Sequence, residues 1–114
     1  MIDPVRFIGN HSSGKMGFAI AERAAARGAR VTLVTGPVLL PTPLGVDRVD
    51  VRSALDMQRE LDRAMGPDLT AADVLIMSAA VADFRPAQRA AHKLKRNPDA
   101  PNAQLDLVQN PDLL

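Results

Sequence analysis

Apolar residues in the first third of the chain follow a helical pattern and then a strand pattern. Between residues 12 and 27 they recur at helical spacing, which predicts an alanine-rich helix capped by Ser12 or Ser13 and ended by Gly28. The apolar face of this helix consists of Phe18, Ala21 and Ala25. Residues 29–35 then form a β-branched run that predicts a strand, closed by a glycine and a proline.

The middle of the chain repeats this alternation. A Pro-rich loop leads to residues 46–51, which are expected to form a second strand. Ser53 with Asp56 three residues later predicts the start of a second helix, which Gly66 ends. Residues 73–78 are almost continuously apolar, as in a strand that is buried on both faces of a parallel sheet.

This order of elements predicts an α/β fold. Strands and helices with short links favour a Rossmann-like, open, mostly parallel sheet with helices on both faces. Residues 79–103 show no regular apolar spacing, which predicts a long loop. Residues 104–108 are expected to form another strand. Asn110, with the following proline and acid, resembles a helix start. Only a short stub, residues 5–8, precedes the first glycine, so we expect the chain to be an incomplete part of a larger domain.

Composition narrows the function classes. Of the 114 residues, 46% are hydrophobic and 24% are charged, which is typical of a globular protein. The net charge of +1 argues against a general nucleic-acid binder. The absence of cysteine excludes disulfides and thiolate metal sites, and His11 and His92 show no zinc-site spacing. No apolar run approaches the ~18 residues of a membrane span and no signal peptide is visible, so a cytoplasmic protein without a membrane partner is expected.

The segment Gly9–Lys15 matches the G-x-x-x-x-G-K pattern of phosphate loops. Met16 stands where that pattern requires a hydroxyl for Mg²⁺, so the segment indicates at most an anion site at a helix start. An ordinary capped helix with close-packed Gly14 and Gly17 explains it equally well. The first glycine of the dinucleotide fingerprint is missing, which argues against a nicotinamide oxidoreductase.

Two later segments could carry a site. Residues 78–84 follow the apolar run, where α/β sheets bind ligands, and Asp83 could hold a metal ion, a ribose or an amine. Alternatively, residues 79–82 begin a helix and Asp83 is solvated. The basic run within residues 85–103 is either a solvated face or a flap that closes on phosphates.

These residues resemble a known family. Residues 3–17 (DPVRFIGNHSSGKMG) resemble the signature of phosphopantothenate–cysteine ligases, which in most bacteria form the C-terminal half of the bifunctional coenzyme A biosynthesis protein. Residues 31–43, 79–84, 93–96 and 110–112 match further family segments in the same order. The resemblance therefore extends over the whole chain.

The resemblance implies a reaction in coenzyme A biosynthesis. The family joins 4′-phosphopantothenate to L-cysteine: CTP activates the carboxylate as an acyl-cytidylate, and the cysteine amine then displaces CMP. Mg²⁺ is required, a homodimer is implied, and FMN belongs only to the decarboxylase half, which this chain lacks. The sequence leaves open whether the nucleotide is CTP or ATP.

Site residues are carried over by position. The resemblance implies catalytic roles for Asn10, Lys93 and Arg6, with Asn10, Ala79 and Ala80 at the substrate. The implied nucleotide-binding residues are Met77, Ser78, Ala79, Asp83, Lys93, Pro111, Asp112, Leu113 and Leu114. Metal ligands remain unassigned.

The chain departs from the family at three places. Arg96 replaces the last lysine of the flap motif K-x-K-K, which keeps the charge. The family's Gly-rich loop before Ile2 and its lysine-bearing continuation after Leu114 are absent, so we expect a partly assembled site. The alternative to a ligase is accordingly a non-catalytic nucleotide-binding fragment of the same domain.

Overall fold

The computed structural model describes residues 1–95 and 102–113. The helices and strands in these residues are α1 (Lys15–Ala26), β1 (Val31–Thr35), β2 (Val46–Asp50), α2 (Ala54–Met65), β3 (Phe84–Pro86) and β4 (Leu107–Gln109). Neither described helix combines the length and the apolarity needed to cross a bilayer.

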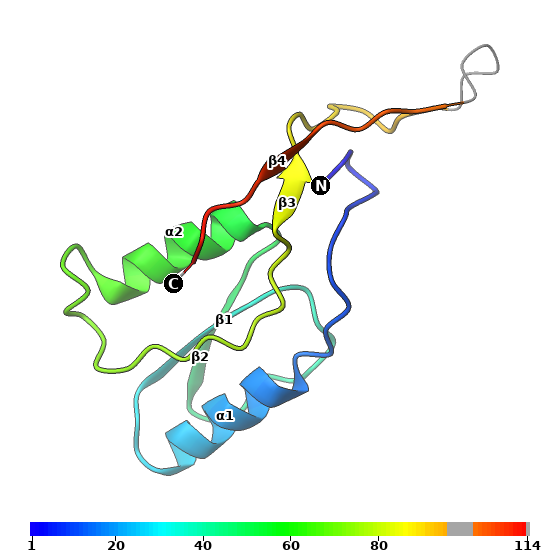
Figure 1. Cartoon of the computed structure of the whole chain (residues 1–114). Coiled ribbons are helices and arrows are strands. Elements are labelled where there is room, and N and C mark those ends of the chain that lie inside the picture. Colours follow the sequence, from blue (N-terminus) through cyan, green and yellow to red (C-terminus); the bar gives the residue numbers. More distant parts are fainter. Residues whose placement is uncertain (96–101, 114) are drawn as a thin grey trace.

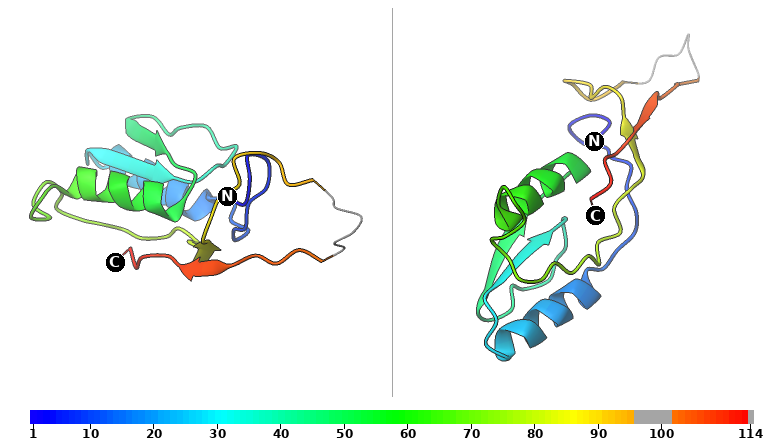
Figure 2. Two further views of the ribbon diagram at one scale, coloured as in Figure 1. Left: turned by 90° about the horizontal axis from the view of Figure 1, so that it is seen from above. Right: turned by 60° about the vertical axis from the view of Figure 1, so that its left-hand side comes forward.

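A parallel pair of strands forms the centre of the body. β1 and β2 pair from Val31 opposite Val46 to Thr35 opposite Asp50, and the Pro-rich loop 36–45 connects them. α1 and α2 lie on opposite sides of this pair (Figures 1 and 2). The buried apolar side chains of the body are Phe18, Ala21, Val46, Val51 and Met57. The predicted α/β fold with parallel strands and helices is confirmed in this form.

Local signals fix most of the helix ends. The Ser53 hydroxyl accepts a hydrogen bond from the Asp56 amide at 3.1 Å, which is the predicted cap of α2. At the end of α1, Gly28 adopts φ +88° and its amide donates to the carbonyl of Ala25. The next amide, from Ala29, donates to a carbonyl one residue earlier, so α1 ends in a Schellman motif as Gly28 predicted.

The predicted start of α1 is wrong. Gly14, not Ser12 or Ser13, occupies the N-cap position, and it does so with φ +72° and without a side-chain cap. The Ser13 hydroxyl lies 3.5 Å from the Lys15 amide, which is too long for an effective cap. The left-handed turn at Gly14 directs the preceding chain away from the helix axis, so the serines precede the first turn.

The predicted strand over residues 73–78 is also wrong. The described structure has no strand there, and Val74, Leu75 and Ile76 are 73%, 41% and 57% exposed. A strand needs a neighbour for its backbone hydrogen bonds, and β1 is paired in the described structure with β2 alone. The segment instead passes the sheet as irregular chain before it reaches β3 (Figure 1).

A second, antiparallel ladder projects from the body as an arm. In it Phe84 of β3 pairs with Gln109 of β4, and Pro86 pairs with Leu107. The strand predicted over residues 104–108 is thus confirmed in part, whereas β3 was not predicted. The described strands form one parallel and one antiparallel pair, so the expectation of one mostly parallel sheet is wrong.

The arm gives the molecule its elongated shape. The molecule measures 60 × 31 × 19 Å, and the arm extends away from the helices in all views (Figures 1 and 2). The helix start predicted at Asn110 stays a prediction, because only residues 111–113 are described after it. Within the described residues, Asn110 binds the chain beside β3 through its backbone amide and its side-chain Nδ2.

Candidate functional site

A cleft of about 630 Å³ lies where the arm joins the body. It is lined by Met77, Ala79, Val81, Ala82, Asp83, Phe84, Gln109, Asn110, Pro111, Asp112 and Leu113. Its two walls are distant in sequence, and most of the residues that the resemblance assigned to the nucleotide line it. Ser78 and Ala80 are not among the lining residues, and Leu114 lies outside the described residues.

Asn110 joins the two walls of this cleft. Its backbone amide donates to the Asp83 carbonyl at 2.7 Å, and its side-chain Nδ2 donates to the Ala82 carbonyl, also at 2.7 Å. The Arg85 guanidinium donates to the Gln109 carbonyl and, at 3.3 Å, to Asn110 Oδ1. The walls are thus fixed by backbone groups and by residues that sequence reasoning did not single out for this purpose.

Asn10 contacts the backbone of the cleft wall that residues 77–84 form. Its Nδ2 is 3.4 Å from the Ala80 carbonyl and 3.3 Å from the Val81 carbonyl, which are long and weak hydrogen bonds. Asn10 is exposed, so exchanging these contacts for a ligand costs little. Asn10 and Ala80, both assigned to the substrate by the resemblance, are thus in contact with each other.

Gly17 brings α1 close to the same segment. A Cβ added at Gly17 would lie 2.9 Å from the Ser78 hydroxyl oxygen, closer than real side chains approach. The close-packing interpretation of Gly17 is therefore confirmed. Ser78 faces α1 and contributes to packing between the helix and the cleft wall.

A buried carboxylate connects the N-terminal residues to the basic segment. The Asp3 side chain has no exposed surface, and the Arg6 guanidinium binds it in a salt bridge. Asp3 also accepts hydrogen bonds from the backbone amides of Val5, Arg6 and Leu94. Hydrogen bonds from the Arg6 guanidinium and from these backbone amides hold the pKa of the Asp3 carboxyl well below its ordinary value of 3.8, against the opposing effect of burial.

Lys93 is adjacent to this contact but is itself exposed. It does not line the cleft in this structure, and neither does Arg6, whose guanidinium binds Asp3 and the Leu94 carbonyl. Arg96, the last residue of the predicted flap motif, lies outside the described residues. The sequence analysis did not identify Asp3 as a functional residue; its spacing of three from Arg6 was the only available signal.

Metal-binding capacity near the cleft rests on two carboxylates. Asp83 and Asp112 both line it, and hard oxygen ligands suit Mg²⁺. No group of three or more metal-ligating side chains occurs within residues 1–95 and 102–113. Mg²⁺ is commonly bound through one or two carboxylates when phosphate groups supply further ligands, and Asp83 and Asp112 are of that ligand type.

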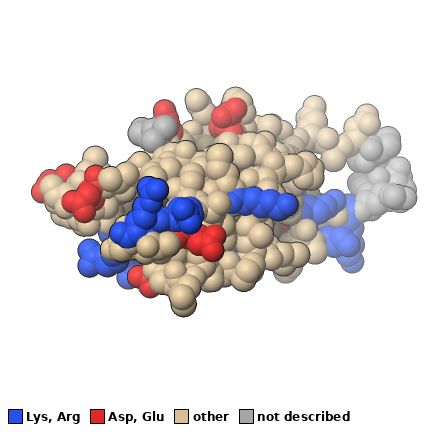
Figure 3. Space-filling view, turned by 90° about the horizontal axis from the view of Figure 1, so that it is seen from below, with Lys and Arg blue, Asp and Glu red and all other residues tan. Residues whose placement is uncertain are grey.

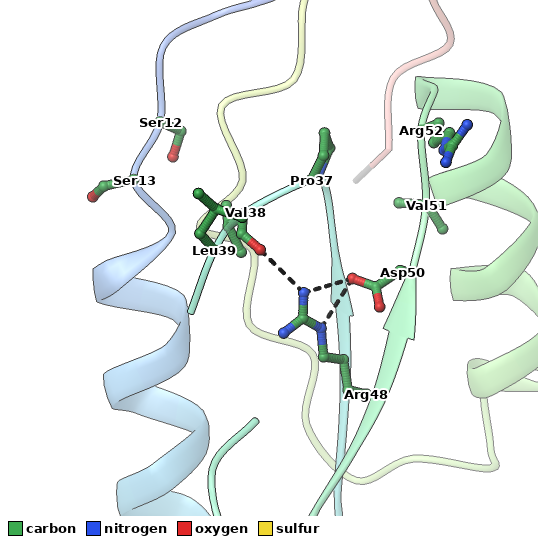
Figure 4. Close-up of a pocket in the computed structure, with 9 residues that line it drawn as sticks. All are labelled: Ser12, Ser13, Pro37, Val38, Leu39, Arg48, Asp50, Val51 and Arg52. Carbon is green, nitrogen blue, oxygen red and sulfur yellow. Dashed lines mark hydrogen bonds and ion pairs between the residues drawn. The ribbon is translucent and has the colours of Figure 1, made fainter. Parts of the chain in front are cut away.

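A second cleft lies between the start of α1 and the end of β2 (Figure 4). Ser12 and Ser13 form one side, and Arg48 lies on the other. The Arg48 guanidinium donates to Asp50 at 2.7 Å and to the Leu40 and Val38 carbonyls. It also lies over the ring of Phe18, 5.2 Å from the ring centre. Because these contacts hold the Arg48 guanidinium against Asp50 and the loop 36–45, Arg48 is less available to an anion in this cleft.

Charge on the face that carries α1 is mixed. Lys and Arg side chains occur in several places on this face, and acidic side chains lie between them (Figure 3). Such interspersed charge agrees with the net charge of +1 and differs from the continuous basic surface of nucleic-acid binders.

Comparisons with known proteins converge on one family. The family described as "DNA/pantothenate metabolism flavoprotein C-terminal domain" matches residues 1–114. The chain is 50% identical over 113 residues to the coenzyme A biosynthesis bifunctional protein CoaBC of Vibrio cholerae and 50% identical over 114 residues to that of Escherichia coli K12. It covers 27% of the length of each of these relatives, and 99% of the chain is aligned in both cases.

A solved structure agrees with this similarity. The crystal structure of the C-terminal domain of a CoaBC protein superposes with a TM-score of 0.76 at 43% sequence identity. The match includes 98% of this chain and 48% of the solved chain.

Proposed function

Because the chain belongs to the DNA/pantothenate metabolism flavoprotein C-terminal domain family, we propose that it carries the phosphopantothenate–cysteine ligase activity of coenzyme A biosynthesis. In the proposed reaction, the carboxylate of 4′-phosphopantothenate attacks the α-phosphorus of CTP, and pyrophosphate leaves. The amine of L-cysteine then attacks the acyl carbon of the acyl-cytidylate, loses a proton and displaces CMP.

The observation that carries this proposal is the cleft between residues 77–84 and 109–113. Two segments that are far apart in sequence, each resembling a nucleotide-contacting segment of the ligases, form its opposite walls. Its volume of about 630 Å³ lies within the usual range for small-molecule sites. Small side chains such as Ala79 and Ala82 allow a ligand to approach the backbone of the first wall.

In this proposal, Asn10 handles the acyl intermediate beside the Ala80 and Val81 carbonyls, which its side chain now contacts. A side-chain amide can donate to a developing oxyanion and accept from an amine without changing its charge. Its present contacts with the Ala80 and Val81 carbonyls are weak enough to be exchanged for such a ligand.

Charge compensation is divided between Lys93 and the metal. Asp83 and Asp112 are the residues that would hold Mg²⁺, which would supply Lewis-acid stabilisation of the phosphoanhydride. Lys93 supplies a further positive charge as that bond breaks. In this proposal Asp83, which lines the cleft, also contacts the nucleotide.

Pyrophosphate release tests the proposal directly. The full-length protein is mixed with CTP, Mg²⁺ and 4′-phosphopantothenate, and pyrophosphate is followed with and without cysteine; ATP in place of CTP tests nucleotide choice. We expect one equivalent of pyrophosphate without cysteine and repeated turnover with it. Asp83→Asn should slow the release about tenfold or more, since hydrogen bonds to charged groups typically contribute this much.

Asp47→Asn provides the matched control, because Asp47 is exposed on β2 and lies outside the cleft. Nucleotide binding without any pyrophosphate release would contradict the ligase proposal and support the non-catalytic nucleotide-binding alternative. Equal losses of pyrophosphate-release rate for Asp83→Asn and Asp47→Asn would mean that the cleft is not the reaction site.

A further inference from the structure

Residues 2–6 form a closed turn, which we name the N-terminal clasp. The Ile2 amide donates to the Arg6 carbonyl at 2.8 Å and closes the turn. Inside it, Asp3 Oδ1 accepts from the amides of Val5 and Arg6, both at 2.9 Å. The carboxylate is completely buried, so the turn is organised around a single fixed charge.

The clasp binds the backbone of Leu94, the residue after Lys93. The Leu94 amide donates to Asp3 Oδ2 at 3.1 Å, and the Leu94 carbonyl accepts from Arg6 Nη2 at 2.9 Å. A third contact, from the Ala90 amide to the Ile2 carbonyl at 2.9 Å, holds the other side of Lys93. Lys93 is thus an exposed cation on a backbone that is restrained on both sides.

We propose that Asp3 is a positioning residue for Lys93, acting through the backbone of Leu94. This inference rests on the proposed function, in which Lys93 compensates charge during pyrophosphate release. A lysine on a restrained backbone loses less conformational entropy when it meets its anionic partner, so more of their attraction remains to lower the barrier.

The same geometry assigns Arg6 to the clasp. Its Nε donates to Asp3 Oδ2 at 2.9 Å, and its Nη2 is shared between Asp3 and the Leu94 carbonyl. A guanidinium fork can bind a carboxylate and a carbonyl together, which a lysine ammonium cannot do with the same geometry. Arg6 therefore influences the reaction through Leu94 in this structure.

A double-mutant cycle tests the proposal in the full-length protein. Single-turnover pyrophosphate release is measured for Asp3→Ala, Lys93→Gln and the double variant. We expect Asp3→Ala to slow release about tenfold, the scale of losing hydrogen bonds to a charged group. The double variant should be no slower than Lys93→Gln, because a residue that acts only through Lys93 has no effect once Lys93 is gone.

Additive losses would overturn the inference, because a general loss of structure also slows the Lys93→Gln protein. Asp47→Ala, at an exposed position on β2, is the matched control and should leave the rate within about twofold. Circular dichroism checks that each variant keeps its helices. If Asp3→Ala unfolds, Arg6→Lys takes its place in the cycle, and the same non-additivity is expected.

A second readout needs no activity. Amide hydrogen exchange of Leu94 should be slow in the wild-type protein and faster in Asp3→Ala and Arg6→Lys, whereas the Met57 amide inside α2 should be unchanged. Unchanged exchange at Leu94 would overturn the clasp itself. If the wild-type protein releases no pyrophosphate, the proposed function fails, and faster Leu94 exchange in the variants would still show that the clasp restrains the segment beside Lys93.

Discussion

Single residues in this structure divide into those that hold the chain and those that are available to a ligand. Asp3 and Asn110 belong to the first group, because each uses its polar atoms to join segments distant in sequence. Asn10 and Lys93 belong to the second group, because both are exposed. Substitution in the first group should therefore disturb contacts within the chain, whereas substitution in the second group should affect ligand interactions.

At this scale, Asn10→Asp should separate the two half-reactions. The change keeps the shape but replaces the amide donor with a negative charge beside the acyl intermediate. Pyrophosphate release without cysteine should stay within about threefold, whereas amide formation should fall by about 10²-fold or more. Quench-flow analysis of pyrophosphate and of the cysteine adduct would measure both. Asn102→Asp, the same change at another exposed position, is the control, and a parallel fall in both half-reactions would refute the assigned role.

Lys93→Gln removes a charge but keeps most of the side-chain length. If Lys93 acts on the breaking phosphoanhydride, pyrophosphate release should slow by about 10²–10³-fold, with a smaller change in phosphopantothenate binding. Arg89→Gln, an exposed cation in the same basic segment, should change the rate by less than about threefold. Single-turnover kinetics would compare the two. Similar losses would mean that the segment acts only through its total positive charge.

Among the helices and strands, sequence-based prediction is accurate where the residues that determine an element's ends lie close together in the sequence. The cap at Ser53 and the Schellman motif at Gly28 were predictable because each involves residues only a few positions apart. Residues 73–78 were not, since an apolar run becomes a strand only if a partner strand offers its backbone groups. The left-handed Gly14 misled the prediction of α1, because two serines before a helix resemble caps whatever the backbone does.

The site follows the same division. The sequence placed Asn10, Ala79 and Asp83 in one neighbourhood through a family resemblance, and the structure brings Asn10 to the wall that contains Ala79 and Asp83. The role of Asp3 could not be predicted, because it depends on Leu94 at the other end of the chain. Long-range contacts of this kind carry no periodic signal.

The two helix starts give an element-scale prediction. Ser53→Ala should lower the free energy of unfolding by about 1 kcal/mol, since it removes a formed N-cap. Ser13→Ala, the same substitution before α1, should change it by less than about 0.5 kcal/mol, because the Ser13 hydroxyl is 3.5 Å from the nearest amide that it could cap. Urea unfolding followed by circular dichroism would measure both. A larger loss for Ser13→Ala would contradict the assignment of Gly14 as the cap.

The whole molecule is less compact than its length suggests. Its radius of gyration is 17.1 Å, whereas a compact domain of this size is expected to have about 13 Å. The projecting arm accounts for this difference, and several large apolar side chains, including Val74, stay exposed. Stability therefore depends on a small core around the β1–β2 pair.

This distribution predicts unequal effects of one substitution. Val51→Thr puts a hydroxyl at a position that is 6% exposed and should lower the free energy of unfolding of the 114-residue chain by about 1–3 kcal/mol. Val74→Thr, at a position that is 73% exposed, should lower it by less than about 0.5 kcal/mol. Urea unfolding of the two variants would measure the difference. A comparable loss at Val74 would mean that residues 73–78 are buried in solution.

The arm has a consequence for binding strength that its contacts alone do not reveal. β3 and β4 close a loop that contains residues 87–106, and the cleft lies at the base of that loop, with one wall from each side. Any ligand that touches both walls therefore bears part of the entropy of closing this loop, and it stabilises the closed ladder in return. Because that entropy grows with the logarithm of loop length, halving the loop would lower the whole closure cost by about 0.6 kcal/mol, so the gain in affinity is at most about threefold and requires no change in the cleft residues. Relatives with identical cleft residues but loops of different length should then bind the same ligand with different strength.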